Sequence, residues 1–323
     1  MTVSYELLEA GQSELLCAAI RRVYGDTYPA PEFYDPDYLR AAIATGLLYS
    51  VVAREADGEV VGCMSTALEI PGDVTADGSA LMIAEDHRGQ GIVGRLGHHS
   101  LEVYQRLGLS GLHLYALALH DRVQNQSGKA GAVVTGVLPA WFSERAKVAG
   151  YGYPDARIGA VCLYMPLAPL PARSCYLPHP YAGELRRIYG ELGADRRLIA
   201  SPDPVTEPAV TTLEIEDKPA NSQRRVLVHR CGVDFAGALE ATLRNTPRAV
   251  TYLDLPLWDA AVGRATACAR EQGFRFGALM VDRRGGDRLR LQSYDSGIAA
   301  PGAMVLASDS ARRLLDFVLA DGD

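Results

Sequence analysis

The sequence has few cysteines and no segment that could cross a membrane as a helix. Its six cysteines are scattered, and none lies within four residues of another, so the close spacing of a zinc site is absent and buried, reduced thiols are expected. No window of eighteen residues is continuously apolar, which excludes a transmembrane helix. The opening residues, MTVSYELLEAGQ, lack the pattern of a signal peptide. We therefore expect a cytoplasmic protein without a metal site.

Clusters of basic residues are also missing. The formal net charge is −7, and the arginine pairs at 186–187, 196–197 and 224–225 are dispersed along the chain. An acidic chain without a basic patch repels nucleic acid and anionic membrane surfaces. We therefore expect neither nucleic acid nor membrane among its partners. With 323 residues, 48% of them apolar, the chain can build two packed cores.

The hydrophobic periodicity predicts an ordered series of strands and helices. Over residues 4 to about 168 the expected order is β-α-α-β-β-β-α-β-α-β-β, which favours an α/β fold in which helices cover a mixed sheet. Four prolines between 168 and 180 indicate a connection. The following segments repeat the strand, helix, strand, strand order of the first part. The predicted organisation is a domain at 1–168, a proline-rich linker at 169–180 and a second domain at 181–323.

One glycine-rich stretch, HRGQGIVG at 87–94, carries the strongest chemical signal. It joins an expected strand, SALMIAE, to an expected helix beginning near residue 92. Unpaired amides and the helix dipole make such a helix start a phosphate site, and glycines let the ligand approach the backbone. A tight turn without a ligand would look similar. GxxxxGK[ST] is absent, and no acidic residue follows at the spacing of a dinucleotide-binding fold.

The segment MIAEDHRGQGIVGRLGHHSLE resembles the acyl-CoA binding segment of the GNAT acyltransferase superfamily, whose signature is Q/R-x-x-G-x-G/A. Arg88 and Gly91 match it, while Val93 stands where a small residue is usual, so Gly94 is a candidate to replace it. The resemblance implies a GNAT fold over about residues 4–168 and a partial, degenerate GNAT-like domain in the C-terminal half. It also implies acetyl-CoA or another acyl-CoA as co-substrate. We expect no second coenzyme site in the C-terminal half, which lacks a glycine-rich loop.

The resemblance assigns roles to particular residues. Met82 and Ile83 would contact the pantetheine arm, and Asn125 lies where the family places a cofactor-contacting asparagine, although the tyrosine that often follows is missing. Tyr115 and Tyr151 are alternative proton donors. The coenzyme diphosphate would be held by Arg88, Gly89, Gln90, Gly91, Ile92, Val93 and Gly94. His87, within the same loop, is expected to face solvent.

Proton transfer and acceptor binding have several candidates. A histidine side chain has an unperturbed pKa near neutrality, roughly 6.5, and His120 ends an expected strand, so it could accept the amine proton. Glu69 and Glu85 are alternative bases. Gln124, one helical turn after His120, could orient the imidazole or bind substrate. The expected aromatic walls of the acceptor site are formed by Tyr28, Phe33, Tyr34 and Trp141; packing of the first three against the core is the competing interpretation.

These features favour an N-acyltransferase that acts on an amine of a small molecule or peptide by direct attack. A catalytically weak protein that binds acyl-CoA for regulation is the main alternative. An enzyme that takes its acyl group from an acyl carrier protein is another. The second half would shape the acceptor cleft or mediate a homodimer, and the sequence does not choose between these roles.

Overall fold

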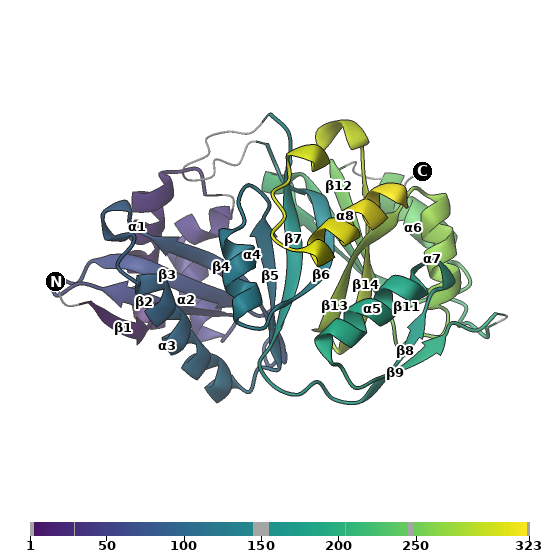
Figure 1. The fold of residues 1–323 in the computed structure, drawn as a ribbon, viewed down its shortest axis with the longest axis horizontal. Helices are drawn as coiled ribbons and strands as arrows, with labels where there is room; N and C mark the ends of the chain where they lie inside the picture. Colours follow the sequence, from purple (N-terminus) through teal and green to yellow (C-terminus); the bar gives the residue numbers. More distant parts are fainter. Residues whose placement is uncertain (1–2, 29, 145–154, 204, 245–247, 322–323) are drawn as a thin grey trace. The chain divides into compact units, whose positions relative to one another are not determined.

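The computed structural model describes residues 3–28, 30–144, 155–203, 205–244 and 248–321. The chain forms two compact units, of which the first comprises Met1–Leu114 and Glu144–Asp155 and the second comprises Tyr115–Ser143 and Ala156–Asp323. The division falls within strand β5 (Gly111–Leu117) (Figure 1). None of the described helices combines the length and the apolar character that a membrane crossing requires.

The first unit contains a twisted row of strands. Neighbours β1 (Ser4–Leu7), β2 (Leu48–Arg54), β3 (Val60–Ala67) and β4 (Thr75–Ile83) pair antiparallel, and β5 pairs with β4 in parallel. The parallel step needs a crossover, which the helix between β4 and β5 supplies. The β4–β5 connection therefore places the glycine-rich stretch at the carboxyl end of β4 (Figure 1).

Helices cover both faces of this row of strands. On one face α1 (Ser13–Tyr24) and α2 (Pro36–Ala44) share a core with inward residues of β2, β3 and β4. On the other face α3 (Ile92–Leu107) packs on the alternate strand residues. The first core contains Leu16, Ile20, Leu39, Val52, Cys63 and Met82. The second contains Val51, Ala53, Val61, Ala84, Ile92 and Leu96. Successive side chains of each strand point to opposite faces of the sheet, so the unit has three layers: helices, sheet and a helix on the other face.

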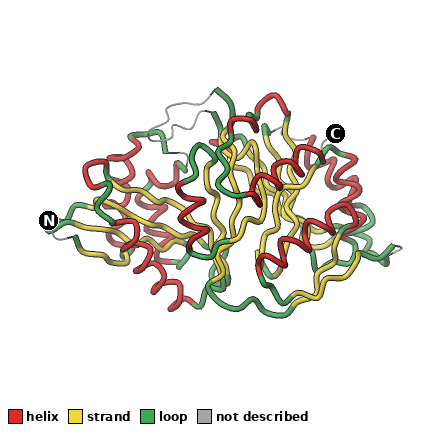
Figure 2. The backbone as a smooth tube through the Cα atoms, in the orientation of Figure 1, coloured by secondary structure: helices red, strands yellow, loops and turns green. Residues whose placement is uncertain are grey.

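The second unit has a longer sheet in the order β5-β7-β6-β13-β14-β12-β11-β10, and β8 and β9 form a separate parallel pair. Its strands are β6 (Val133–Phe142), β7 (Ile158–Pro166), β8 (Arg173–Leu177), β9 (Arg196–Ala200), β10 (Thr212–Lys218), β11 (Gln223–Arg230), β12 (Val250–Pro256), β13 (Arg275–Arg283) and β14 (Gly286–Tyr294). Its helices are α4 (Arg122–Lys129), α5 (Ala182–Leu192), α6 (Phe235–Arg244), α7 (Val262–Glu271) and α8 (Asp309–Ala320). Figure 2 shows how these strands and helices alternate along the backbone.

The order of elements repeats between the two halves of the chain. The series β4-α3-β5-α4-β6-β7 recurs as β11-α6-β12-α7-β13-β14, and the first two strands of each series are parallel. In each series the last strand lies between its two predecessors, giving β5-β7-β6 and β12-β14-β13. The two hairpins meet edge to edge, because β6 pairs antiparallel with β13 at Gly136 and Ala278.

The mixed α/β fold and the element order expected over residues 4–168 are confirmed. The domain organisation observed differs from the predicted boundary at 168, because β6 and β7 belong to the second unit. The proposed linker at 169–180 contains strand β8. Strand β9 and helix α8 were not anticipated. The first is short, and the second has the regular amphipathic period and the Ser308 N-cap that should have identified it.

Candidate functional site

The loop between β4 and α3 is open to its surroundings. After the short 3₁₀ turn Glu85–His87, Gly89 and Gly91 adopt positive φ angles of 79° and 74°, which L side chains rarely adopt. A Cβ added at Gly89 or Gly94 would meet no atom within 4 Å, and one at Gly91 would meet only an Arg95 nitrogen at 4.0 Å. The glycines therefore leave room for a bound group directly against the backbone.

The start of α3 presents donors toward this space. The first bond of the helix runs from the amide of Arg95 to the carbonyl oxygen of Gly91, at 3.4 Å. The amides of Ile92, Val93 and Gly94 precede that bond and have no carbonyl one turn earlier in the helix to pair with. A helix of sixteen residues adds partial positive charge at this end. Unpaired helix-start amides and this partial charge are the features by which helix N-termini bind phosphate groups.

Two exposed arginines surround the loop. Arg88 donates from Nε to the carbonyl oxygen of Ile83 at 3.4 Å, and Arg95 donates from Nη2 to that of Gln90, also at 3.4 Å. Gln90 in turn donates from its side chain to the carbonyl oxygen of Asp86 at 3.2 Å. These hydrogen bonds connect side chains of the loop to backbone carbonyls before and within it. The two guanidinium groups also add positive charge beside the amides.

Strand β4 turns backbone donors away from β3 near the same loop. The amide of Ala84 donates to Val61 at 2.8 Å, and the register pairs Met82 with Cys63 and Ile83 with Gly62. Because antiparallel pairs alternate, the Ile83 amide points to the opposite edge of β4. The described pairing with β5 covers only Thr75–Asp77 of β4, and the β3–β4 register shifts between Met64 and Thr66. Such a bulge commonly redirects a strand next to a functional site.

A comparison with protein families identifies this arrangement. Residues 17–125 match the family described as the acetyltransferase (GNAT) family, and the matched range includes β4, the glycine-rich loop and α3. The match places a GNAT acetyltransferase domain at residues 17–125. The expectation based on Arg88 and Gly91 is thereby confirmed at the level of the family.

Solved structures similar to the GNAT half share little sequence with it. A chimera of the spermidine N-acetyltransferase SpeG from Vibrio cholerae and hSSAT is 18% identical, covers 52% of this chain and 96% of its own, and has a TM-score of 0.39. The protein yncA from Salmonella typhimurium, solved with its cofactor acetyl-CoA, is 15% identical, with 52% and 95% covered and a TM-score of 0.40. PaiA N-acetyltransferase from Thermoplasma acidophilum, in complex with coenzyme A, is 15% identical, with 51% and 99% covered and a TM-score of 0.37. No curated protein matches the sequence.

His87 does not face solvent as expected. Only 7% of the residue is exposed, since its ring lies between the carboxylates of Asp86 and Glu55. The sequence carries little sign of this burial, because Glu55 lies far from His87 in the chain and reaches it only through the β2–β3 turn.

The two alternative bases lie at the ends of strands. Glu85 begins the 3₁₀ turn after β4 and is exposed, and Glu69 follows the end of β3.

The aromatic residues expected to contact the acceptor pack on the core of the first unit. Phe33 is 4% exposed and belongs to the α1–α2 core, against which Tyr28 and Tyr34 pack. The ring of Tyr28 meets that of Phe33 edge-on at 5.5 Å, and the Tyr34 hydroxyl accepts from the Tyr28 amide at 2.7 Å. These contacts match the competing interpretation, in which the rings serve packing.

The expected residues after β5 belong to the second unit. Strand β5 ends at Leu117, so His120 lies in the turn before α4. Gln124 is 5% exposed; its amide nitrogen donates to the carbonyl of Val305 at 2.8 Å, and its oxygen accepts from the amide of Ala307 at 3.0 Å. The Gln124 amide thus holds a distant segment of the chain. Asn125 is exposed on α4.

Trp141 lies in an aromatic cluster of the second unit. Its ring stacks on Tyr115, with centroids 4.4 Å apart and planes at 6°, and lies 5.4 Å from the ring of Tyr252. The hydroxyl of Tyr115 accepts from Nη1 of buried Arg290 at 3.2 Å, while Asp254 accepts two hydrogen bonds from that arginine at 2.7 Å each. Burial alone would raise the pKa of Asp254. The neighbouring guanidinium groups of Arg290 and Arg225 stabilise its carboxylate form and lower that pKa instead. Tyr151, the other expected donor, lies outside the described residues.

The corresponding loop of the second half is occupied by the chain itself. After β11, the amides of Cys231, Gly232 and Val233 donate to Asp259, Thr211 and Pro208, at 2.8, 3.0 and 2.9 Å respectively. A Cβ at Gly232 would overlap the backbone of Val210. These contacts fill the loop between β11 and α6 with hydrogen bonds of the chain to itself.

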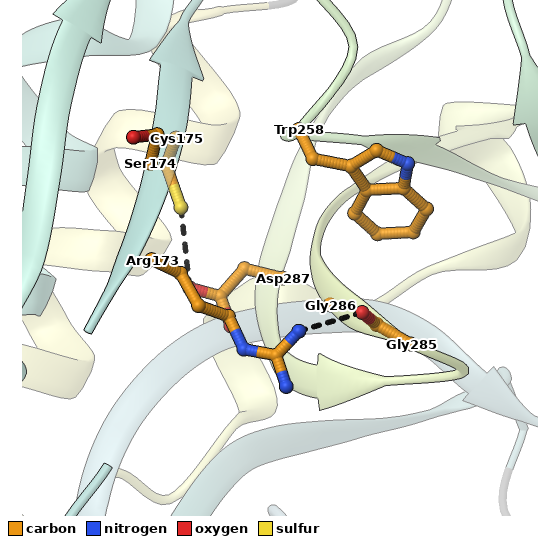
Figure 3. Close-up of a pocket in the computed structure, with 7 residues that line it drawn as sticks. All are labelled: Arg173, Ser174, Cys175, Trp258, Gly285, Gly286 and Asp287. Carbon is orange, nitrogen blue, oxygen red and sulfur yellow. Dashed lines mark hydrogen bonds between the residues drawn. The ribbon is translucent and has the colours of Figure 1, made fainter. Parts of the chain in front are cut away.

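A pocket of about 220 Å³ lies within the second unit (Figure 3). The guanidinium of Arg173 donates to the carbonyl of Gly285 at 2.7 Å, and the Cys175 thiol donates to Asp287 at 3.5 Å. Burial, followed by the charge of Asp287, raises the pKa of Cys175 to about 12. The thiol therefore stays protonated and is no nucleophile. The pocket is lined by Arg173, Ser174, Cys175, Trp258, Gly285, Gly286 and Asp287, none of which the sequence had suggested as functional.

Proposed function

We propose that the protein transfers an acetyl or longer acyl group from a coenzyme A thioester to an amine of a small molecule or peptide. The observation that carries the proposal is the glycine loop at the start of α3, where a Cβ at Gly89 or Gly94 would meet nothing within 4 Å and the first helix amides have no carbonyl one turn earlier. The GNAT match over residues 17–125 supports the same reaction class. The loop has the donors and the room that a diphosphate needs.

The residues Arg88 to Gly94 would hold the diphosphate, chiefly through the amides of Ile92, Val93 and Gly94. The Ile83 amide, directed away from β3, is the proposed donor to the thioester carbonyl oxygen, where negative charge grows during the reaction. The thioester supplies an activated acyl group. Placing the donor at the end of β4 keeps it adjacent in sequence to the diphosphate loop.

In the proposed reaction the amine nitrogen forms a bond to the acyl carbon, and the carbon–sulfur bond breaks. The amine loses one proton, for which His120 is the proposed acceptor, with Glu69 and Glu85 as alternatives. The departing thiolate gains one proton, for which we propose Tyr115, since the Arg290 guanidinium beside its hydroxyl favours proton release. Asn125 remains a proposed coenzyme contact and Trp141 a proposed acceptor contact.

Direct attack is favoured over an acyl-cysteine intermediate. Burial raises the pKa of Cys63 to about 12 and that of Cys175 to about 12, and it also raises the pKa of Cys17 and Cys268. Thiols with raised pKa values hold almost no thiolate at neutral pH, and thiolate is the nucleophilic form. Both substrates should therefore bind before either product leaves.

The experiment combines coenzyme binding with turnover. Calorimetry with coenzyme A and with acetyl-CoA measures whether the loop binds the coenzyme. Release of free thiol from acetyl-CoA measures acyl transfer to a panel of polyamines, amino acids and peptides. Initial rates at varied concentrations of both substrates should give intersecting rather than parallel double-reciprocal lines, the signature of a ternary complex. Binding without turnover with any amine would favour the regulatory alternative. Failure to bind free coenzyme, with turnover from an acylated carrier protein, would favour that donor.

A further inference from the structure

The corner between the β2–β3 turn and the glycine loop contains a buried histidine for which the proposed reaction has no role. His87 is the last residue of the 3₁₀ turn and immediately precedes Arg88, and 8% of its side chain is exposed. Its Nδ1 lies 2.9 Å from a carboxylate oxygen of Asp86, and its Nε2 lies 3.2 Å from one of Glu55. Each ring nitrogen thus has a carboxylate partner.

These two contacts require a specific protonation state. An ionised carboxylate only accepts hydrogen bonds, and a neutral imidazole carries a single N–H. Both bonds therefore form together only when His87 is the doubly protonated imidazolium. The hydrogen bonds to Asp86 and then to Glu55 raise the pKa of His87, and the bond from His87 lowers the pKa of Asp86.

The other charges at this corner favour the same state. From α1, Arg22 donates to Asp86 at 2.9 Å and also pairs with Glu59. The carboxylate oxygens of Glu55, Asp57 and Glu59 lie within 4.8 Å of one another. Protonation of the His87 imidazole therefore offsets part of the negative charge of Asp86, Glu55 and the carboxylates beside Glu55.

The Glu55 side of the contact is anchored to the sheet. The amide of Glu55 donates to the carbonyl of Glu59 at 2.9 Å, which closes the turn between β2 and β3. The His87 side begins a loop whose next residues include glycines at positive φ. The histidine therefore links the β2–β3 hairpin to the first residue of the glycine loop.

We propose that His87 is a positioning residue that holds the glycine loop in its coenzyme-binding geometry through simultaneous hydrogen bonds to Glu55 and Asp86. This inference rests on the proposed function, since the loop must bind the coenzyme. The contact is complete while the imidazole is protonated. Because the folded-state pKa is raised above its ordinary value of roughly 6.5, the contact persists to a higher pH than that value and is lost as the pH rises through the raised pKa.

The test measures coenzyme A affinity by calorimetry between pH 6 and 9 in the wild-type chain, in His87→Gln and in Glu55→Gln. Loss of one charge-assisted hydrogen bond is expected to weaken binding roughly ten-fold. The wild type should therefore weaken by about that factor as the pH rises through the raised pKa of His87, because loss of the histidine proton removes one of the two bonds. His87→Gln should be weak throughout and show little of that pH dependence. Glu55→Gln should bind more weakly at pH 6 and lose its affinity at a lower pH.

His98→Gln is the matched control, since His98 lies on α3 in the same unit, is 73% exposed and has a single carboxylate, Glu102, at 3.7 Å. It should follow the wild-type profile. A titration of the His87 ring signals by NMR, without coenzyme, gives an independent readout in which the pKa of His87 must lie above its ordinary value. Hydrogen exchange of the amides at 88–94, corrected for the intrinsic effect of pH, should accelerate over the same range.

The outcomes separate the two proposals. If coenzyme A fails to bind at every pH, the proposed function is overturned. If it binds but His87→Gln keeps the wild-type affinity and pH profile, or if His87 titrates at or below its ordinary pKa, the positioning role is wrong while the proposed function stands. Thermal unfolding of each variant distinguishes a loss of affinity from a loss of fold.

Discussion

Gly91 combines two properties at one residue, a positive φ angle and a position directly at the start of α3. Replacing it by alanine adds a methyl group to a backbone conformation that costs an L-residue about 1–2 kcal/mol. The methyl group would also point into the space proposed for the diphosphate. We expect Gly91→Ala to lower the free energy of unfolding by about that amount and to weaken coenzyme A binding about ten-fold, measured by calorimetry.

Gly108 provides a control at the other end of the same helix. It has a φ angle of 66°, and a Cβ there would meet nothing within 4 Å, so Gly108→Ala introduces comparable backbone strain far from the loop. The two variants should lose similar stability, measured by denaturant unfolding, while only Gly91→Ala loses coenzyme affinity. Equal affinity losses would show that the loop residue acts through stability alone.

For single residues, the sequence could predict those features that depend only on neighbouring residues in the chain. The strand-to-helix turn that contains Gly89 and Gly91 could be located because glycines at positive φ and the start of an amphipathic helix leave a local pattern in the sequence. The burial of His87 could not be recognised, because its partner Glu55 is brought there by the β2–β3 hairpin. Contacts that depend on strand register are invisible to local patterns.

Among the elements, α4 is joined to a segment far along the chain through one buried side chain. The Gln124 amide holds both the carbonyl of Val305 and the amide of Ala307. Gln124→Ala would leave these two backbone groups without the partners they have here, and we expect the free energy of unfolding to fall by about 2 kcal/mol. Denaturant unfolding measures this loss. If the role is structural, the KM for the amine at fixed acetyl-CoA should change little.

The exposed Gln126, two residues further along α4, supplies the control. Gln126→Ala should leave stability unchanged within a few tenths of a kcal/mol, since exposed substitutions away from special features are nearly neutral. A large rise in the KM of Gln124→Ala without a loss of stability would instead support substrate binding. The sequence placed Gln124 correctly on a helix after His120, but the segment that it holds comes from the far end of the chain.

At the scale of the whole molecule, the two loops predict the coenzyme stoichiometry. The GNAT loop is open, whereas the amides after β11 are taken by Asp259, Thr211 and Pro208. Calorimetry should therefore give one coenzyme A per chain, and Gly91→Ala should weaken that single event. Two equivalent binding events would contradict the assignment, because they would require the second loop to release its own hydrogen bonds.

The large-scale organisation was only partly accessible from the sequence. Periodicity and turn residues predicted the order of strands and helices in the first half, because each element is defined by its own residues. The compact units divide within β5, and no local feature marks that point. The pairing of β6 with β13 joins residues far apart in the chain, and only the complete sheet reveals it.

That junction depends on Gly136, where a Cβ would overlap the backbone of Gly277 and Ala278. The approach of the two hairpins therefore tolerates no side chain at this position. A chain cut after residue 168 would end with β6 as a bare edge, whose unsatisfied backbone groups attract strands from other molecules. Dividing the protein at its proline-rich stretch should consequently yield an aggregating fragment rather than a smaller working enzyme.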